Sequence, residues 1–379
     1  MQVSGAWLTH PGTQALCAVL EGAGYQALFV GGCVRNALLG AAVSDVDIST
    51  DAQPEIVTIL AEKAGFKVVP TGIDHGTVTV IAQGVPHEVT TFRRDVETDG
   101  RHAVVAFSTD VAEDAARRDF TMNALYADAR GAVIDPLGGL PDLLARRLRF
   151  VGDPETRIRE DYLRILRFFR FHAWYADPEG GMDAEGLAAC AALSAGIETL
   201  SAERVGAEVK KLLTAPDPAP AVASMAQAGV LGLVLPGADA RALAPLVHLE
   251  NGAPPRALRR LAALAGENPA DRLRLSRAES RDLASLRAAI GDMSPPAVLG
   301  WRLGADLAAD ALLARAAVLE SPLPPGWQAE VARGAASTFP VKAADLPHLT
   351  GPALGAELKR LQQIWLSGDL RPTRDDLLN

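Results

Sequence analysis

The stretch ALFVGGCVRNALLGAAVSDVDIST, residues 27–50, places two glycines, an arginine and two closely spaced aspartates in one short segment. Its apolar run 27–30 is long enough for a buried strand, and two glycines follow it directly. Gly31 and Gly32 let backbone N–H groups approach a ligand without interference from a Cβ atom. A helix that we expect to end at Gly40 comes next. The segment therefore predicts a strand, a glycine turn and a helix, an arrangement that binds anions.

The glycine turn does not match the dinucleotide pattern G-x-G-x-x-G, because the second and third glycines of that pattern are missing. Arg35 follows in the first turn of the expected helix, where its guanidinium can bind phosphate oxygens. The pattern favours a site for the phosphates of a nucleotide over a dinucleotide fold.

A pair of aspartates closes the stretch. Asp45 and Asp47 flank Val46, so on a strand both carboxylates point to the same face, about 6 to 7 Å apart at Cα. Two like charges at that spacing repel unless cations lie between them, and Mg²⁺ binds carboxylate oxygens together with phosphate oxygens. The alternative is a solvated turn, but the glycines and Arg35 upstream favour a catalytic metal site.

Hydrophobic patterning divides the chain into two kinds of structure. Short apolar runs bounded by turn residues predict a mixed sheet with helices between its strands. The expected strands are 27–30, 46–48, 67–69, 77–82, 87–92, 103–107 and 133–134. After Pro141 the pattern becomes helical, with proline-rich stops. The stops are 214–220, 252–255, 293–296 and 321–325. The predicted fold class is α+β, a mixed-sheet head followed by all-α domains.

Composition excludes several classes of protein. The 379 residues carry a net charge of −9, which argues against a uniformly basic nucleic-acid binder. Cys17, Cys33 and Cys190 are too far apart for a CxxC metal site and are expected to be buried thiols. No apolar run approaches membrane-spanning length, and the first twenty residues lack a secretory signal pattern. We expect a cytoplasmic protein with no membrane contact.

Further motifs follow in a fixed order. They are PTGIDHGTVTV (70–80), HEVTTFRRD (87–95), RRDFTMNALYAD (117–128), DPLGGLPDL (135–143), REDYLRILRFFRF (159–171), SAERVGAEVKKLL (201–213) and GPALGAELKRLQQIWLSGD (351–369). With the opening stretch, they resemble the motifs of the class II tRNA nucleotidyltransferases, which are the CCA-adding enzymes, and of the related bacterial poly(A) polymerases. The resemblance is strong from about residue 26 to 213 and weaker beyond.

The resemblance implies a domain order and an activity. It implies an N-terminal helical segment at 1–25, followed by a nucleotidyltransferase head at 26–150. A neck at 151–236 would bind the nucleotide base and RNA, and a helical body and tail at 237–379 would bind tRNA. The implied reaction is template-independent addition of CCA to the tRNA 3′ end from CTP and ATP, with release of pyrophosphate and with Mg²⁺ as cofactor.

The resemblance also implies roles for residues of the head. Gly31, Gly32 and Arg35 match the triphosphate-binding turn, and Asp45 and Asp47 match the metal-binding pair. Three further residues match contacts to triphosphate and sugar, namely Arg118, Asp119 and Asn123.

Three head residues leave room for other interpretations. For Asp119 the alternative is helix capping or an internal salt bridge. Asn36 departs from the family, which usually has aspartate there, so any role of that carboxylate is in doubt. Glu88, on the strand HEVTTF, is a candidate third carboxylate whose role the resemblance does not settle.

The segment 159–171 predicts a largely buried neck helix with an arginine face. Asp161, Arg164, Arg167 and Arg170 follow at three-residue spacing, so the three arginines cover an arc of about 120°. Arginines among phenylalanines need partners, because an unpaired buried charge is costly. Internal salt bridges are one possibility, and Glu160 is placed to pair with Arg164.

The other possibility is base recognition. Cytosine and adenine both present an amine donor beside a ring-nitrogen acceptor, whereas uracil and guanine present a carbonyl and a ring N–H. Asp161 can accept from the amine while Arg164 donates to the ring nitrogen, so the wrong bases leave buried polar groups unpaired. The resemblance implies this pair as the protein template, with Arg167 and Arg170 supporting base or phosphates.

Three rival functions differ from CCA addition in visible features. Bacterial poly(A) polymerases carry a basic, phenylalanine-containing signature that is missing near 70–80. Enzymes that add only part of CCA, such as CC-only relatives, lack a loop after the FRR strand, but here 95–107 spans that place with Asp95, Asp99 and Arg101. A noncatalytic RNA-binding protein is disfavoured by the intact aspartate pair.

Arginines of the second half are candidates for tRNA phosphate contacts. They are equally plausible as solvated helix faces. The six are Arg256, Arg259, Arg260, Arg272, Arg274 and Arg277.

Overall fold

The computed structural model of the protein describes residues 1–73, 76–99 and 102–379. It contains two compact units. Unit 1 comprises Met1–Leu200 with Ala228–Val230, and unit 2 comprises Ser201–Gln227 with Leu231–Asn379. All residues predicted for the head site and the base-binding helix lie in unit 1.

Unit 1 is built on a seven-stranded sheet with the order β3-β4-β5-β2-β1-β8-β9. The strands are β1 (Leu28–Val30), β2 (Asp47–Thr50), β3 (Lys67–Gly72), β4 (Thr77–Ala82), β5 (Val85–Thr91), β8 (Tyr126–Ala127) and β9 (Val133–Ile134). β2 pairs in parallel with β5, and the other pairs are antiparallel. The predicted mixed sheet is confirmed, and β8 is a strand that the apolar pattern does not predict.

A separate two-stranded sheet joins β6 (Arg93–Asp99) to β7 (His102–Phe107). The strand expected at 103–107 lies in β7, whereas the charged strand β6 is not predicted by any apolar run. Arg101 lies outside the described residues, as do the side chains of Asp95 and Asp99, so the predicted role of this segment in A addition stays a prediction.

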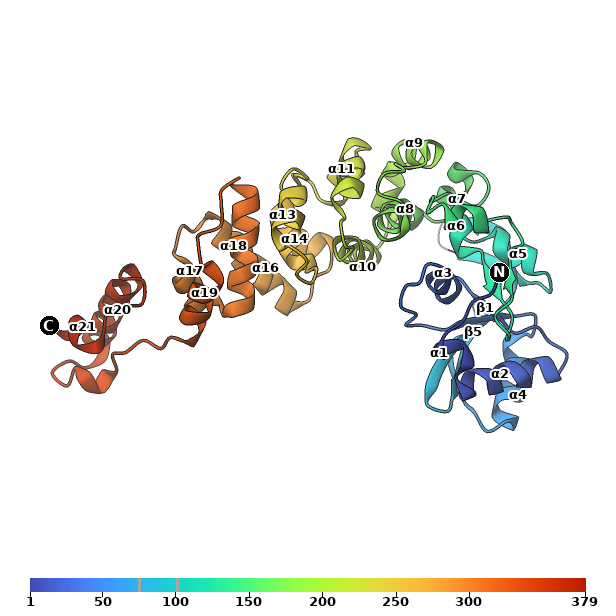
Figure 1. The fold of residues 1–379 in the computed structure, drawn as a ribbon, viewed down its shortest axis with the longest axis horizontal. Helices are drawn as coiled ribbons and strands as arrows, with labels where there is room; N and C mark the ends of the chain where they lie inside the picture. Colours follow the sequence, from blue (N-terminus) through green and yellow to red (C-terminus); the bar gives the residue numbers. More distant parts are fainter. Residues whose placement is uncertain (74–75, 100–101) are drawn as a thin grey trace. The chain divides into compact units, whose positions relative to one another are not determined.

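Helices cover the sheet and bury its apolar residues. α1 (Ala6–Thr9) and α2 (Pro11–Gly22) precede β1, and α3 (Gly32–Leu38) follows it. α2 packs beside α4 (Pro54–Lys63), and Figure 1 shows the two next to each other. Cys17 and Cys33 are buried thiols in this region, as is Cys190 further on, which confirms their prediction.

The remaining elements of unit 1 connect the sheet to the helix that carries the arginine face. They are α5 (Val111–Ala116), η2 (Thr121–Asn123), α6 (Leu140–Leu144), α7 (Pro154–Glu160), α8 (Leu163–Tyr175), α9 (Ala184–Ala192) and η3 (Ser194–Thr199). Phe120 packs against Phe150 and Phe171, with ring centroids 5.0 Å apart in both pairs, so the start of the η2 segment and α8 share one aromatic core.

The prediction of one continuous neck helix over 159–171 is wrong. α7 ends at Glu160 and α8 begins at Leu163. Asp161 between them is extended, with φ −155° and ψ 105°, and its Oδ1 accepts from the backbone N–H of Leu163. Asp161 thus lies at a break between two helices, where its carboxylate accepts from an N–H at the start of α8. The three-residue spacing on α8 therefore holds only for Arg164, Arg167 and Arg170.

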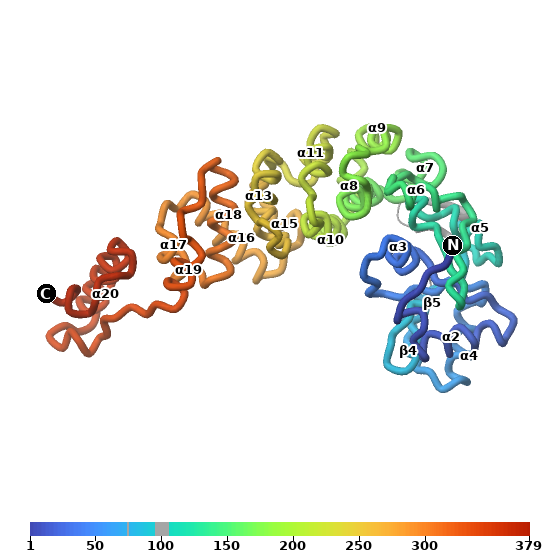
Figure 2. Tube along the Cα trace, viewed as in Figure 1, coloured from blue at the N-terminus to red at the C-terminus, as the bar shows by residue number. Residues whose placement is uncertain are grey.

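Unit 2 is helical, as predicted, and Figure 2 follows its trace. Its elements are α10 (Ala202–Leu213), α11 (Ala219–Gln227), α13 (Leu243–Glu250), α14 (Ala257–Leu264), α15 (Pro269–Arg272), α16 (Arg277–Gly291), α17 (Pro296–Leu303), α18 (Ala305–Val318), α19 (Trp327–Ala336), η4 (Ala343–Asp345), α20 (Gly351–Ser367) and α21 (Arg374–Leu378), while α12 (Val230–Val234) follows α11. Trp365 and Leu361 of α20 pack in one core with Ala297 and Val298 of α17. In the described part of the chain, no helix combines the length and the apolar character needed to span a membrane.

For two of the six arginines, the predictions of tRNA contact and of a solvated helix face are both wrong. Arg259 and Arg260 are buried, 3% and 1% exposed, and both pair with the buried Glu250. Arg260 also donates to the carbonyl oxygens of Leu213 and Ala215, because two buried guanidinium groups need this many acceptors. These side chains therefore form ion pairs and hydrogen bonds inside unit 2 and do not face solvent.

The other four candidates differ in their surroundings. Arg256 pairs with Asp310, Arg274 pairs with Glu203, and Arg272 donates to a backbone carbonyl. Arg277 starts α16 and is exposed. For these four arginines, tRNA contact stays a prediction.

Candidate active site

The aspartate pair lines an acidic cavity where the start of β2 lies beside β5. Asp47 begins β2, and the parallel register places it opposite Glu88 of β5. Asp45 lies just before β2 and outside it, which corrects the prediction that one strand carries both aspartates. All three carboxylates nevertheless line a single cavity of about 400 Å³. The structure thus brings together the predicted pair and the undecided Glu88.

Burial and nearby negative charge change the pKa of Asp47. Burial and the nearby carboxylates of Glu88 and Asp45 raise the pKa of Asp47 to about 6, against the opposing influence of Arg118. The ionised form is therefore disfavoured in the folded protein unless a cation compensates for it.

We expect Asp47→Asn to raise the thermal stability of the metal-free protein at pH 7.5. The raised pKa means that Asp47 favours folding when protonated, below its ordinary value near 3.8, and loses that contribution as pH rises through about 6. The gain is on the order of 1 to 2 kcal/mol, after allowance for partial exposure. Melting curves between pH 4 and 8 should show the difference shrinking toward pH 4 and after addition of Mg²⁺. A difference that is constant across this range would contradict the assignment.

The carboxylates fit a metal that completes its coordination with other ligands. Among residues 1–73, 76–99 and 102–379, no group of three or more His, Cys, Asp or Glu side chains is arranged to hold a metal ion alone. Mg²⁺ usually takes one or two protein carboxylates together with substrate phosphates and water. The carboxylates of Asp45 and Asp47, with Glu88 beside them, fit that part of a metal site.

The glycine turn lies between β1 and α3. Gly31 has φ 67° and ψ −115°, a conformation that favours glycine. A Cβ atom built on Gly31 would lie 3.5 Å from Nη1 of Arg118, and one on Gly32 would lie 3.8 Å from Nη2 of Arg35. The backbone of the turn therefore runs directly beside two guanidinium groups.

Arg118 connects this turn to the acidic strand. It forms an ion pair with Asp114 at 3.1 Å and donates to the hydroxyl of Tyr126 at 3.0 Å. Its Nη2 lies 3.4 Å from Oγ of Ser49 on β2, the strand that begins with Asp47. Arg118 thus lies between β2, which begins with Asp47, and the glycine turn.

Asn36 has a visible role. Its Oδ1 accepts hydrogen bonds from Nε and Nη2 of Arg35 at 3.2 and 2.9 Å, and its Nδ2 donates to the carbonyl of Ala42 at 2.8 Å. The amide therefore orients the guanidinium of Arg35 without neutralising it.

Asp119 and Asn123 join α8 to the head. Asp119 accepts from Nε of Arg167 at 2.7 Å and from Nδ2 of Asn123 at 3.0 Å. Oδ1 of Asn123 accepts in turn from Nη1 of Arg35. Although burial by itself raises the pKa of Asp119, its ion pair with Arg167 and its hydrogen bonds lower it overall. The alternative interpretation of Asp119 as part of an internal salt bridge is therefore confirmed.

Arg164 is also held by an internal salt bridge. It pairs with Glu160 and donates to the carbonyl oxygens of Arg157 and Arg117, at 2.8 and 3.1 Å. Arg157 pairs with the same Glu160. These contacts fix the α7–α8 junction against the end of α5, where a cation is favourable. Asp161 lies at this junction, three residues before Arg164 and outside α8, the helix that carries Arg164.

Three arginines surround one aromatic ring of α8. The guanidinium carbons of Arg35, Arg167 and Arg170 lie 5.1, 5.1 and 4.3 Å from the centroid of Phe171. Burial and the nearby positive charges of Arg170 and Arg167 lower the pKa of Arg35. An anion in this region would relieve that repulsion.

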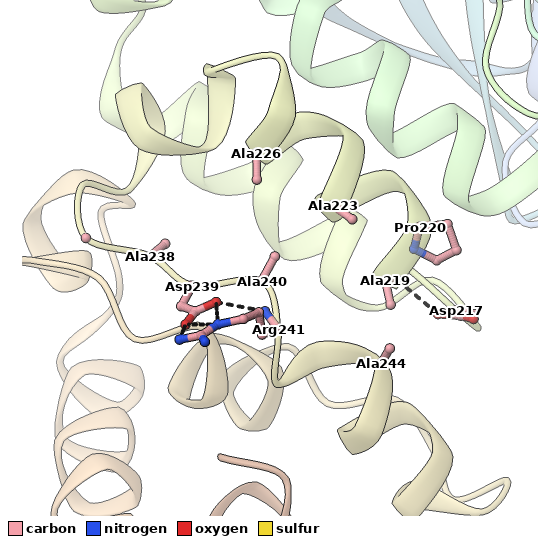
Figure 3. Close-up of a pocket in the computed structure, with 11 residues that line it drawn as sticks. Asp217, Ala219, Pro220, Ala223, Ala226, Ala238, Asp239, Ala240, Arg241 and Ala244 are labelled. Atoms are coloured by element: carbon pink, nitrogen blue, oxygen red, sulfur yellow. Dashed lines mark hydrogen bonds and ion pairs between the residues drawn. The ribbon is translucent and has the colours of Figure 1, made fainter. Parts of the chain in front are cut away.

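A larger cavity of about 770 Å³ lies in unit 2 and lacks comparable chemistry. Figure 3 shows that its wall is formed mainly by alanines, with the side chains of Asp239 and Arg241 bonded to each other. The third charged residue of the wall, Asp217, accepts a hydrogen bond from the backbone N–H of Ala219. The predicted site residues lie in unit 1.

Comparison with known domain families places this site in context. Residues 27–149 match the Poly A polymerase head domain, and residues 182–241 match the family described as the probable RNA and SrmB-binding site of polymerase A. The first match covers the glycine turn, both aspartates and the Arg118 segment.

Curated relatives match about half of the chain. The chain is 41% identical over 204 residues to the mitochondrial CCA tRNA nucleotidyltransferase 1 of Mus musculus, covering 54% of this chain and 47% of that protein. It is 46% identical over 200 residues to a CCA-adding enzyme of Streptococcus pyogenes, covering 52% and 48%. The match thus spans about half the length of these relatives.

A solved structure extends the similarity to most of the chain. It is the CCA-adding enzyme of Bacillus stearothermophilus in complex with CTP, with 28% identity, a TM-score of 0.71 and coverage of 94% of this chain and 93% of that one. The predicted fold class, a mixed-sheet head followed by helical domains, is confirmed by this likeness. With its head and RNA-binding matches, the chain is similar to CCA-adding enzymes and to the poly(A) polymerase domain families.

Proposed function

We propose that this protein is a nucleotidyltransferase that adds CCA to the 3′ end of tRNA, using CTP and ATP and releasing pyrophosphate. The observation that carries the proposal is the juxtaposition in unit 1 of an acidic cavity and an arginine cluster, joined by Arg118 and the glycine turn. The CTP complex of the Bacillus stearothermophilus relative supports a nucleotide as ligand.

The acidic end would hold the metal. Asp45 and Asp47, with Glu88 beside them, would bind Mg²⁺, and the metal would supply charge neutralisation at the reacting phosphate. Proton release from Asp47, whose pKa is about 6, suits metal binding near neutral pH.

The basic end would hold the triphosphate. Gly31 and Gly32 let the backbone approach it, Arg35 and Arg118 offer guanidinium groups, and Asn123 fixes Arg35. Asp119 would act on the nucleotide by holding Arg167 in place. The substrate's 3′-hydroxyl would then attack the α-phosphorus, and catalysis would come from positioning and charge stabilisation.

The α7–α8 junction would read the base. We propose that Asp161 accepts from the exocyclic amine of cytosine or adenine and that Arg164 donates to the ring nitrogen. The contacts of Arg164 with Glu160 and two carbonyls support this role, because they fix the guanidinium before substrate binds. Arg167 and Arg170 would support the bound nucleotide from the same helix.

The proposed division of labour places the head at 26–150, the neck at 151–236 and a tRNA-binding body and tail at 237–379, after an N-terminal helical segment at 1–25. The RNA-binding family match at 182–241 supports RNA contact from the neck onward. We propose a cytoplasmic enzyme.

The reaction is tested with a tRNA transcript that lacks its 3′ CCA. We expect CTP alone to give addition of two nucleotides and CTP with ATP to give three, both only with Mg²⁺. Electrophoresis at single-nucleotide resolution measures this. Unlimited addition of A would indicate a poly(A) polymerase, and failure to use ATP after CC would indicate a CC-only enzyme.

A further inference from the structure

Three aromatic residues form a row along the last turn of α8, and one of them is exposed. The ring centroid of Tyr175 lies 5.3 Å from that of Phe171 and 6.4 Å from that of Trp174. Phe171 is buried and Tyr175 is half-buried, whereas Trp174 is 40% exposed. The other four of the five tryptophans in the chain are buried or half-buried. Trp174 is therefore the tryptophan with the largest exposed fraction.

Guanidinium groups lie beside this aromatic row. Cζ of Arg35 lies 3.9 Å from the ring centroid of Tyr175. Cζ of Arg170 lies 4.3 Å from the ring centroid of Phe171. Arg170 and Trp174 are one helical turn apart, so their side chains lie on the same face of α8. Rings beside guanidinium groups are typical of sites for single-stranded nucleic acid, because bases stack on the rings and the cations attract phosphates.

Trp174 lies too far along α8 to contact the base of the incoming nucleotide. Arg164, which we propose to read that base, lies in the first turn of the same helix. At a rise of about 1.5 Å per residue, Arg164 and Trp174 are about 15 Å apart along the helix axis. Stacking requires van der Waals contact between ring and base. A base that stacks on Trp174 therefore belongs to a different nucleotide.

We infer that Trp174 stacks on an unpaired base near the 3′ end of the RNA substrate. This inference rests on the proposed function of the same site, because nucleotide addition brings the RNA 3′ end to unit 1. Bases inside a duplex already stack on each other, so the base that Trp174 contacts is unpaired. Arg170, on the same face of α8, would attract the adjacent phosphate. Because stacking tolerates any base, Trp174 would hold the strand without selecting the nucleotide.

Binding of two RNAs, measured by fluorescence anisotropy of end-labelled transcripts, tests Trp174. One is a tRNA transcript that ends in CC, and the other is the same transcript shortened until its 3′ end is fully paired. Trp174→Ala should weaken binding of the first about tenfold and leave binding of the second close to wild type. Trp174→Phe, which keeps a smaller ring, should lose less. Ile59→Ala shortens an exposed apolar side chain on α4 and is the matched control, with wild-type affinity for both RNAs.

Abasic residues identify the base that stacks. Each unpaired 3′ nucleotide is replaced in turn by an abasic residue, which removes the base and keeps the phosphate. At one position the wild type should lose about tenfold in affinity, and Trp174→Ala should lose nothing further. Equal losses in both proteins at every position would overturn the inference. Wild-type affinity of Trp174→Ala for the unpaired end would do the same, as would an equal loss on both transcripts.

Tryptophan fluorescence gives a readout that does not require Trp174→Ala to fold. The transcript that ends in CC should quench the fluorescence of the wild type, and the difference from the fully paired transcript should disappear in Trp174→Phe. A difference that persists in Trp174→Phe would contradict the role of Trp174, as would equal quenching of the wild type by both transcripts.

Nucleotide addition separates this inference from the proposed function. In Trp174→Ala the KM for the RNA should rise about tenfold while the KM for CTP stays nearly constant, because the ring does not contact the incoming nucleotide. A wild type that prefers the unpaired end and adds no nucleotide refutes the proposed function alone. A wild type that adds CCA while Trp174→Ala keeps its KM for the RNA refutes the inference alone.

Discussion

Replacement of Asp47 by asparagine is expected to reduce nucleotide addition by roughly a thousandfold or more. The change removes a charged metal ligand from the cavity that Asp45 and Glu88 share, and a loss of about 4 kcal/mol of transition-state stabilisation corresponds to that factor. Single-turnover addition of C to a tRNA transcript measures the rate. Binding of tRNA and the fold itself should be retained.

Glu62→Gln is the matched control for this experiment. Glu62 is an exposed carboxylate on α4, outside the acidic cavity, so its loss should leave the rate unchanged. An Asp47→Asn variant within about tenfold of the wild-type rate would show that β2 does not carry the metal.

The second large effect is expected at Asp161. Asp161→Ala removes the acceptor for the exocyclic amine and leaves Arg164 held by Glu160 and two carbonyls. The ratio of kcat/KM for CTP over UTP should therefore fall by about a hundredfold or more, because rejection depends on unpaired buried polar groups. Metal binding should be retained.

Glu179→Ala, at an exposed position shortly after α8, should leave discrimination unchanged. Competition of each nucleotide against CTP on the same transcript gives the ratios directly. If Asp161→Ala rejects UTP and GTP as well as the wild type does, the proposed template pair is wrong.

Much of the head was predictable because its strands are short, apolar and bounded by turns. The expected strands at 77–82 and 133–134 coincide with β4 and β9, and Thr77–Ala82 alternates between buried and half-buried residues. β6 and β8 escape this criterion. β6 is a charged strand in a two-stranded sheet, and β8 is only two residues long and fully buried.

The break at Asp161 was not predictable from periodicity. The apolar pattern continues through 159–171, and no proline or glycine interrupts it. The helix nevertheless breaks where Glu160 pairs with both Arg157 and Arg164, whose guanidinium groups donate to carbonyls at the end of α5. Such a contact between distant segments overrides local propensity and leaves no mark in a single sequence.

The sequence allowed the residues of the candidate site to be identified, but it did not predict which side chains they contact. The glycine turn and the aspartate pair could be recognised from spacing, but the sequence offered no reason for Asn36. Its role depends on a side-chain contact with Arg35 and on a backbone carbonyl of a later loop. The burial of Arg259 and Arg260 likewise depends on ion pairs of both with Glu250, and these tertiary contacts are not evident from the sequence.

In the proposed reaction, one site selects C and A without a template and stops after three additions. The most direct test incubates the wild-type protein with Mg²⁺, all four nucleoside triphosphates and a tRNA transcript ending before CCA, and then sequences the 3′ ends of the products. We expect nearly all extended molecules to end in CCA and to carry nothing further. Ends that contain U or G, or that continue as runs of A, would contradict it.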